Sequence, residues 1–149
     1  MTFSKLFSLR GKVAIVTGAS RGIGKAIAAG FAEAGADLAL VARSESKLIE
    51  VQQELQSIGA KAEIFPYDLR QTDGIPDWVA QVVEACGRID ILVNNAGTTH
   101  RADAIDFPEE RWDEVITLNL KSVWLLCQNV GRGMVERGSG KIINIAALL

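Results

Sequence analysis

The chain has 149 residues, with 16 lysines and arginines against 18 aspartates and glutamates, which gives a formal net charge of −2. This length allows one domain, and the charge provides no positive field that would hold nucleic acid. Apolar residues make up 48% of the chain, which excludes disorder, and no apolar run reaches the roughly 18 residues of a membrane span. The first ten residues lack a secretory cleavage site. We therefore expect a cytoplasmic protein with one domain over residues 1–149 and no nucleic-acid or membrane partner.

Short apolar runs alternate with longer amphipathic segments along the chain, which is typical of a parallel sheet with helices on its faces. The first strand is expected at Val13–Thr17, followed by a helix over 22–34 whose apolar residues recur every four positions. A second strand over 38–42 precedes a helix over 44–58, with Ser44 as its predicted N-cap.

The second half of the chain continues the same alternation. Helices are expected over 77–86 and over 108–137, the longer one with an irregularity near Asn119. Further strands are expected at three apolar runs, 62–65, 89–93 and 141–146, the last of the buried kind. The predicted fold class is α/β, a Rossmann-like doubly wound parallel sheet with right-handed crossovers. Because the last residues are still apolar, we expect a chain truncated after the fifth strand, the N-terminal part of a longer protein.

Two cysteines, Cys86 and Cys127, lie within apolar helical patterns. Their separation does not match the spacing of metal ligands. We interpret them as buried thiols and expect neither a disulfide nor a metal site.

Residues 17–24, with the sequence TGASRGIG, connect the first strand to the first helix. Gly18 suits a turn conformation closed to other residues, Gly22 allows a pyrophosphate to approach the main chain, and Gly24 allows close packing of helix and strand. The helix N-terminus supplies free N–H donors for phosphates. This pattern predicts a dinucleotide site, and the alternative is a glycine-rich turn without a ligand.

The end of the second strand indicates which dinucleotide is preferred. NAD-binding proteins of this architecture carry an acidic residue there, for the ribose 2′-hydroxyl. This chain has Ala42 and then Arg43, which together with Arg21 suits a 2′-phosphate. We therefore expect NADP, with NAD as the alternative cofactor, unless both arginines are only solvated.

The spacing of the glycines in residues 17–24, together with the Asn-Asn-Ala-Gly sequence of residues 94–97, resembles the short-chain dehydrogenase/reductase family. The resemblance extends from about Leu9 to the last residue. It implies an NAD(P)-dependent oxidoreductase acting on a small hydroxy or keto substrate.

Within that family the chain is most similar to the sugar-acid branch, of the 2-deoxy-gluconate 3-dehydrogenase and gluconate 5-dehydrogenase types. The residues that carry this narrower similarity are Arg101-Ala102-Asp103-Ala104, Trp112, Leu118-Asn119, Lys121-Ser122-Val123 and residues 140–146. The 3-oxoacyl reductase branch shares several of these positions and is the alternative.

The resemblance also implies which residues contact the cofactor. Asp68 and Leu69 correspond to the adenine contact, although an ordinary turn-capping aspartate is the alternative for Asp68. Asn95, Ala96 and Gly97 correspond to positions near the riboses, whereas Asn94 is expected to tie the central strands together. The full set of predicted cofactor residues is Gly18, Ser20, Arg21, Gly22, Ile23, Gly24, Arg43, Asp68, Leu69, Asn95, Ala96 and Gly97.

The catalytic residues of the family are only partly present. Asn119 corresponds to the catalytic asparagine, whose main-chain carbonyl holds a water, and Ala147 stands where the family has a serine. The single tyrosine, Tyr67, has no lysine four residues later, so we expect it to pack beside the adenine. We therefore expect the 149-residue chain to be inactive and its longer parent to be the enzyme, the alternative being a catalytically dead dinucleotide-binding domain.

Two further interpretations concern partners. His100 and Arg101 are candidates to meet a substrate carboxylate, although a solvated surface histidine is the simpler interpretation of His100. The segment 108–137 has more apolar and small residues than one buried stripe needs, Trp124 among them. The resembling family pairs this helix with a second copy, so we expect a homodimer or homotetramer, with core burial as the alternative.

Overall fold

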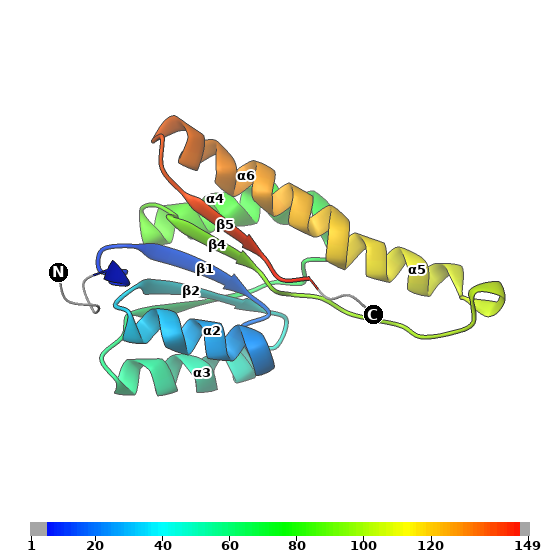
Figure 1. Ribbon diagram of the computed structural model, residues 1–149, viewed down its shortest axis with the longest axis horizontal. Helices are drawn as coiled ribbons and strands as arrows, with labels where there is room; N and C mark the ends of the chain where they lie inside the picture. Colours follow the sequence, from blue (N-terminus) through cyan, green and yellow to red (C-terminus); the bar gives the residue numbers. More distant parts are fainter. Residues whose placement is uncertain (1–5, 147–149) are drawn as a thin grey trace.

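The computed structural model describes residues 6–146 and contains a five-stranded parallel sheet of order β3-β2-β1-β4-β5 (Figure 1). Its strands are β1 (Val13–Thr17), β2 (Asp37–Ala42), β3 (Ala62–Pro66), β4 (Ile91–Asn94) and β5 (Lys141–Asn144). Because β1 pairs with both β2 and β4, the direction of strand addition reverses between β1 and β4. The predicted α/β fold class is confirmed. In such sheets ligands bind outside the carboxyl ends of the strands at this reversal.

Helices cover both faces of the sheet (Figure 1). On one face lie α2 (Gly22–Glu33) and α3 (Glu45–Ser57), and on the other lie α4 (Ile75–Cys86) and α6 (Ser122–Glu136). Shorter elements are η1 (Thr72–Gly74), η2 (Ala104–Asp106) and α5 (Glu109–Ile116). A π-helical turn, η3 (Thr117–Lys121), joins α5 to α6, so the predicted irregularity near Asn119 is confirmed.

The alternation of side chains along β1 explains why the domain has two apolar cores. Val13 and Ile15 belong to the cluster packed under α4 and α6, whereas Ala14 and Val16 belong to the cluster packed under α2 and α3. Successive strand residues point to opposite faces, so one buried strand serves both layers. Each fully buried aliphatic side chain stabilises the folded state by roughly 1.5–3 kcal/mol. This burial holds in place the strand ends that form the site.

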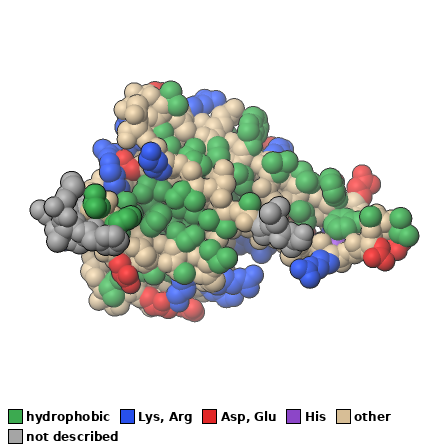
Figure 2. Space-filling model, in the orientation of Figure 1, with side chains coloured by type: hydrophobic (Ala, Val, Ile, Leu, Met, Phe, Trp, Pro, Cys, Tyr) green, Lys and Arg blue, Asp and Glu red, His purple; other side chains and the backbone are tan. Residues whose placement is uncertain are grey.

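The prediction that the fifth strand is buried is wrong. Every residue of β5 is exposed, and Ile142 and Ile143 are 38% and 41% exposed. The physical reason is that β5 lies at the edge of the sheet and pairs only with β4 among the described strands. Figure 2 shows apolar side chains gathered in the middle of the face where β5 lies.

Two smaller predictions, the N-cap at Ser44 and the burial of the cysteines, are corrected by the structure. Ser44 precedes α3 as predicted, but its Oγ lies 3.2 Å from Oγ of Ser46 and does not cap the helix. Both cysteines are free but only half-buried, and burial raises the pKa of the Cys86 thiol to about 11. Cys127 reaches a polar neighbour, since Nδ2 of Asn94 donates to its Sγ at 3.3 Å.

Within residues 6–146 no helix is both long and apolar enough to cross a membrane.

Candidate functional site

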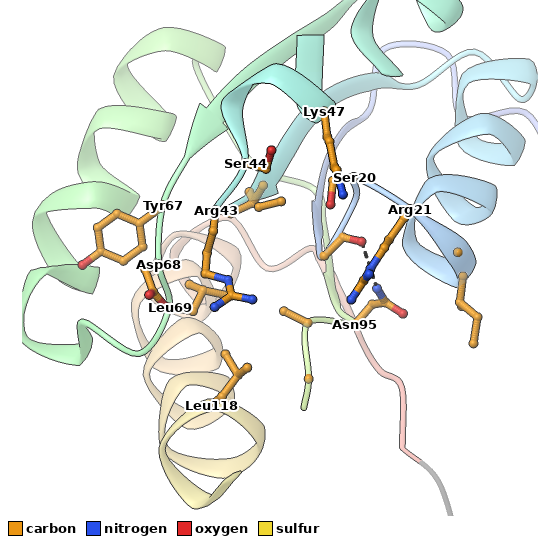
Figure 3. Close-up of a pocket in the computed structure, with 17 residues that line it drawn as sticks. Ser20, Arg21, Arg43, Ser44, Lys47, Tyr67, Asp68, Leu69, Asn95 and Leu118 are labelled. Carbon is orange, nitrogen blue, oxygen red and sulfur yellow. Dashed lines mark hydrogen bonds between the residues drawn. The ribbon is translucent and has the colours of Figure 1, made fainter. Parts of the chain in front are cut away.

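A cavity of about 450 Å³ lies at the carboxyl ends of β1 to β4, where the strand order reverses. All the predicted cofactor residues except Gly24 line this cavity. Tyr67, which was expected beside the adenine, also lines it. The sequence did not indicate a ligand contact for the other lining residues, which are Val41, Ala42, Ser44, Lys47 and Leu118. Figure 3 shows these side chains arriving from separate segments of the chain.

The glycine turn after β1 has the conformation that its sequence predicts. Gly18 has a φ of +67°, in the left-handed region where other residues are strained. A Cβ on Gly24 would stand 2.5 Å from Nδ2 of Asn95 and would also collide with the carbonyl of Gly18. Gly24 therefore lies behind the cavity wall and lets α2 begin directly against the turn, as the close-packing interpretation predicts.

Thr17 connects the turn to the end of β4. Its Oγ1 donates to the carbonyl of Val93 at 3.1 Å and accepts from the main-chain N–H groups of Asn95 and Ala96 at 2.9 and 3.0 Å. Asn95 returns a hydrogen bond from Nδ2 to the carbonyl of Thr17 at 3.0 Å. Thr17 is buried, so these bonds are shielded from water and fix the spacing of the two strand ends. The sequence analysis included Thr17 in the motif of residues 17–24 but assigned it no role of its own.

Positive charge gathers on one side of the cavity. Arg43, from the end of β2, extends into the cavity between Asp68 on one side and Arg21 on the other (Figure 3). Lys47, in the first turn of α3, adds a third cation that sequence reasoning missed. Ala42 lines the same wall, so no carboxylate stands at the end of β2. This wall suits an anionic group.

Asp68 makes the turn-capping contact that its sequence position allowed, and it also borders the cavity. Its Oδ1 accepts from the main-chain N–H of Arg70 at 3.1 Å, which is the turn-capping bond. The hydrogen bond from the Arg70 side chain is the main reason why the pKa of Asp68 lies below its usual value. Tyr67 lines the cavity as well, with its ring 5.4 Å from that of Trp78 and its hydroxyl donating to the carbonyl of Gln71 at 2.6 Å.

Asn119 lies in the π turn and holds the segment that follows β4. Its Oδ1 accepts from the N–H of Thr98 at 2.9 Å, and its Nδ2 donates to the carbonyl of Thr98 at 2.7 Å. A hydrogen-bond pair of this kind fixes the loop beside Gly97, which lines the cavity, and the neighbouring Leu118 lines it directly.

Two other predicted residues lie away from the cavity lining. His100 is half-buried rather than fully solvated, because its ring meets the edge of Phe107 at 5.4 Å. Arg101 is exposed. Asn94 was predicted to tie the central strands together, but it ties β4 to the edge strand β5, since its Nδ2 donates to Oδ1 of Asn144 at 2.8 Å. Ala147 lies outside the described residues.

A family model described as short chain dehydrogenase matches residues 12–149. The chain belongs to the short-chain dehydrogenase family. The resemblance predicted from the glycine turn and from residues 94–97 is therefore confirmed.

Individual relatives extend this assignment. The chain is 48% identical over 143 residues to the 2-dehydro-3-deoxy-D-gluconate 5-dehydrogenase of Bacillus subtilis, covering 96% of this chain and 56% of that protein. A solved gluconate 5-dehydrogenase of Burkholderia cenocepacia, in complex with NADP and tartrate, is 36% identical with a TM-score of 0.91, covering 98% of this chain and 57% of that one. A solved 3-oxoacyl reductase of Agrobacterium tumefaciens, with NADP bound, is 33% identical with a TM-score of 0.93, covering 99% and 57%.

These matches show where the similarity lies and how far it reaches. Both of the predicted branches occur among the relatives, and the chain spans about half the length of the relatives that it matches.

Proposed function

We propose that this chain binds NADP, with NAD as the alternative cofactor, as the nucleotide-binding part of an oxidoreductase that interconverts a small hydroxy acid and its keto acid. The observation that carries the proposal is the cationic wall of the cavity, where Arg21 and Arg43 face the same space and Ala42 replaces an acidic residue. A 2′-phosphate matches two guanidinium groups and has no carboxylate at Ala42 to repel it.

Each part of the cavity has a role in this proposal. The free N–H groups at the start of α2 hold the pyrophosphate beside Gly22, and Arg21 and Arg43 hold the 2′-phosphate. Asp68 and Leu69 border the adenine. Asn95, Ala96 and Gly97 border the riboses, and Ile23 and Ser20 complete the turn beside the phosphates. When bound, NADP supplies or accepts the hydride.

Asn119 has a supporting part in the proposed reaction. Its side chain is engaged by Thr98, so the side chain positions the loop that ends the cavity. The π turn widens the helix at this point, and we propose that the main-chain carbonyl of Asn119 holds a water for proton transfer.

A sugar acid is the substrate class that we propose, because the relatives named for gluconate derivatives include the one that is 48% identical. A 3-oxoacyl thioester is the second candidate, since a 3-oxoacyl reductase matches with a TM-score of 0.93. Comparing turnover of a keto sugar acid with that of a 3-oxoacyl thioester by the complete enzyme separates the two.

The replacement Arg43→Ala tests the choice of cofactor. We expect it to weaken NADP binding about tenfold or more, because one charge-assisted hydrogen bond contributes roughly 1.5–3 kcal/mol. NAD, which has no 2′-phosphate, is expected to keep its affinity. Isothermal titration of both nucleotides measures the effect. Arg10→Ala is the matched control, since Arg10 precedes the amino end of β1 and the cavity lies at the carboxyl ends of the strands. Tighter binding of NAD than of NADP by the unmodified protein contradicts the proposal.

We also propose that the segment 108–137 pairs with a second copy of the chain. Leu120 and Trp124 are 61% and 57% exposed on this segment, and α5 projects beyond the sheet (Figure 1). Light scattering is expected to give a dimer or tetramer mass, and Trp124→Glu is expected to lower it. Ile58→Glu, at an exposed apolar residue after α3, is the control that keeps the mass. A monomer mass for the unmodified, folded protein contradicts this pairing.

A further inference from the structure

The junction between the π turn η3 and helix α6 contains a hydrogen bond that a regular helix would not make. The main-chain N–H of Ser122 donates to the carbonyl of Thr117, five residues earlier. In an α-helix the same N–H would donate to the carbonyl of Leu118, four residues earlier. The π turn therefore takes from Leu118 the main-chain donor that a regular helix provides.

The side chain of Ser122 supplies a donor in its place. Oγ of Ser122 donates to the carbonyl of Leu118 at 2.6 Å, and Ser122 is only 1% exposed. A serine within a regular helix often shares a carbonyl that already has its main-chain donor. Here the hydroxyl serves a carbonyl whose usual donor bonds elsewhere, at a place where little water can replace it. The hydroxyl of Ser122 therefore stabilises the π turn.

The π turn determines where the side chains of Leu118 and Asn119 point. One extra residue in a helical turn rotates the side chains before it by about 100° relative to those after it. The buried side of α6 begins at Ser122, whereas Leu118 lines the cavity. Asn119 bonds to both the N–H and the carbonyl of Thr98. Both placements therefore depend on the turn keeping its extra residue.

We propose that Ser122 is a positioning residue, whose hydroxyl keeps the π turn formed and thereby holds Asn119 and Leu118 in place beside the cavity. Ser122 does not itself line the cavity, so it acts through these two neighbours. Its effect on the reaction rests on the proposed function, in which the main-chain carbonyl of Asn119 holds a water for proton transfer. Its effect on the turn does not depend on that function.

Amide hydrogen exchange at Thr98 tests the effect on the turn, because Oδ1 of Asn119 accepts from this N–H. Ser122→Ala is expected to speed exchange at Thr98 about tenfold relative to the amides of β1, the effect of one lost hydrogen bond. The amides of β1 report unfolding of the whole domain. Ser57→Ala is the matched control, because Oγ of Ser57 donates to the carbonyl of Glu54 at 2.6 Å, at the end of α3. It is expected to leave the ratio of the two exchange rates unchanged.

Two further variants keep this test decisive. Asn119→Ala removes the acceptor itself, so adding Ser122→Ala to it is expected to speed exchange at Thr98 no further. Ser122→Thr keeps a hydroxyl that reaches the carbonyl four residues earlier, and is expected to restore slow exchange. Equal acceleration at Thr98 and in β1, additive effects in the double variant, or a folded Ser122→Thr that exchanges like Ser122→Ala would each overturn the proposal.

Turnover by the complete enzyme tests the effect on the reaction. Ser122→Ala is expected to lower kcat about tenfold and to change KM for the keto acid by no more than about twofold, because a displaced water slows proton transfer and removes no substrate contact. Expressing kcat per NADPH-binding site removes the contribution of unfolded protein. An unchanged kcat overturns the role of Ser122 in the reaction. If the unmodified enzyme reduces neither a keto sugar acid nor a 3-oxoacyl thioester, the proposed function fails, while exchange at Thr98 still decides whether Ser122 holds the turn.

Discussion

Replacing Gly24 by alanine is expected to weaken NADP binding roughly a hundredfold, the largest loss that we expect from a single added methyl group. The added Cβ meets the carbonyl of Gly18 and Nδ2 of Asn95, and neither neighbour can withdraw. Gly18 is fixed by its turn, and Asn95 is fixed by its bonds to Thr17. The start of α2 must therefore move, and overpacking of this kind typically costs about 1–3 kcal/mol. The same movement misaligns the N–H groups proposed to hold the pyrophosphate.

Gly30→Ala is the matched control on the same helix. A Cβ at Gly30 meets nothing within 4 Å, and Gly30 has ordinary helical geometry. This replacement is expected to stabilise the protein by roughly 0.5–1 kcal/mol, because alanine loses less backbone entropy in a helix than glycine does. Thermal unfolding and isothermal titration with NADP measure both variants. Equal NADP affinities for Gly24→Ala and Gly30→Ala would show that the close packing of α2 has no bearing on binding.

The strands and the glycine turn could be predicted from the sequence because local rules determine them. The buried run Val13–Thr17 matches β1, and the positive φ of Gly18 follows from the turn it must make. The π turn at Asn119 was likewise predicted as an irregularity. The exposure of β5 could not be predicted in the same way. An apolar run indicates that a strand favours apolar neighbours, but it does not show whether another element covers the strand.

The remaining contacts depend on which segments meet in space. Nη1 of Arg70 donates to Oε1 of Glu114, although the two residues are 44 positions apart in sequence and no periodicity relates them. Lys47 reaches the cavity only because α3 begins directly beside Arg43. The rings of His100 and Phe107 meet within the segment between β4 and α5. The sequence of this segment has no periodic pattern that would predict the contact.

A polypeptide of these 149 residues is expected to bind NADPH without transferring its hydride. Carbonyl reduction in the resembling family requires a tyrosine to donate a proton, a lysine to lower the pKa of that tyrosine, and a serine to hold the developing oxyanion. We propose that Ala147 stands at the serine position. The single tyrosine of the sequence, Tyr67, is followed four residues later by Gln71. In the structure the hydroxyl of Tyr67 already donates to the carbonyl of Gln71, so this tyrosine is committed elsewhere.

The size of the expected loss follows from the missing groups. An absent oxyanion donor costs about a hundred- to a thousandfold in rate, roughly 2.7–4 kcal/mol. An absent general acid costs about a hundred- to ten-thousandfold more. Asn119 does not compensate, because its side chain is bound to Thr98 and it supplies no proton of suitable acidity.

The assay follows NADPH oxidation with a keto sugar acid and, separately, with a 3-oxoacyl thioester, after titration has shown that the polypeptide binds NADPH. Ala147→Ser is expected to restore nothing in this polypeptide, since a lone oxyanion donor has no proton donor beside it. In a longer protein that carries a Tyr-x-x-x-Lys sequence, the same replacement is expected to raise the rate about a hundredfold or more. NADPH oxidation by the 149-residue polypeptide above the buffer rate would mean that the catalytic groups lie within these 149 residues and that Asn119 has partners other than those assigned to it.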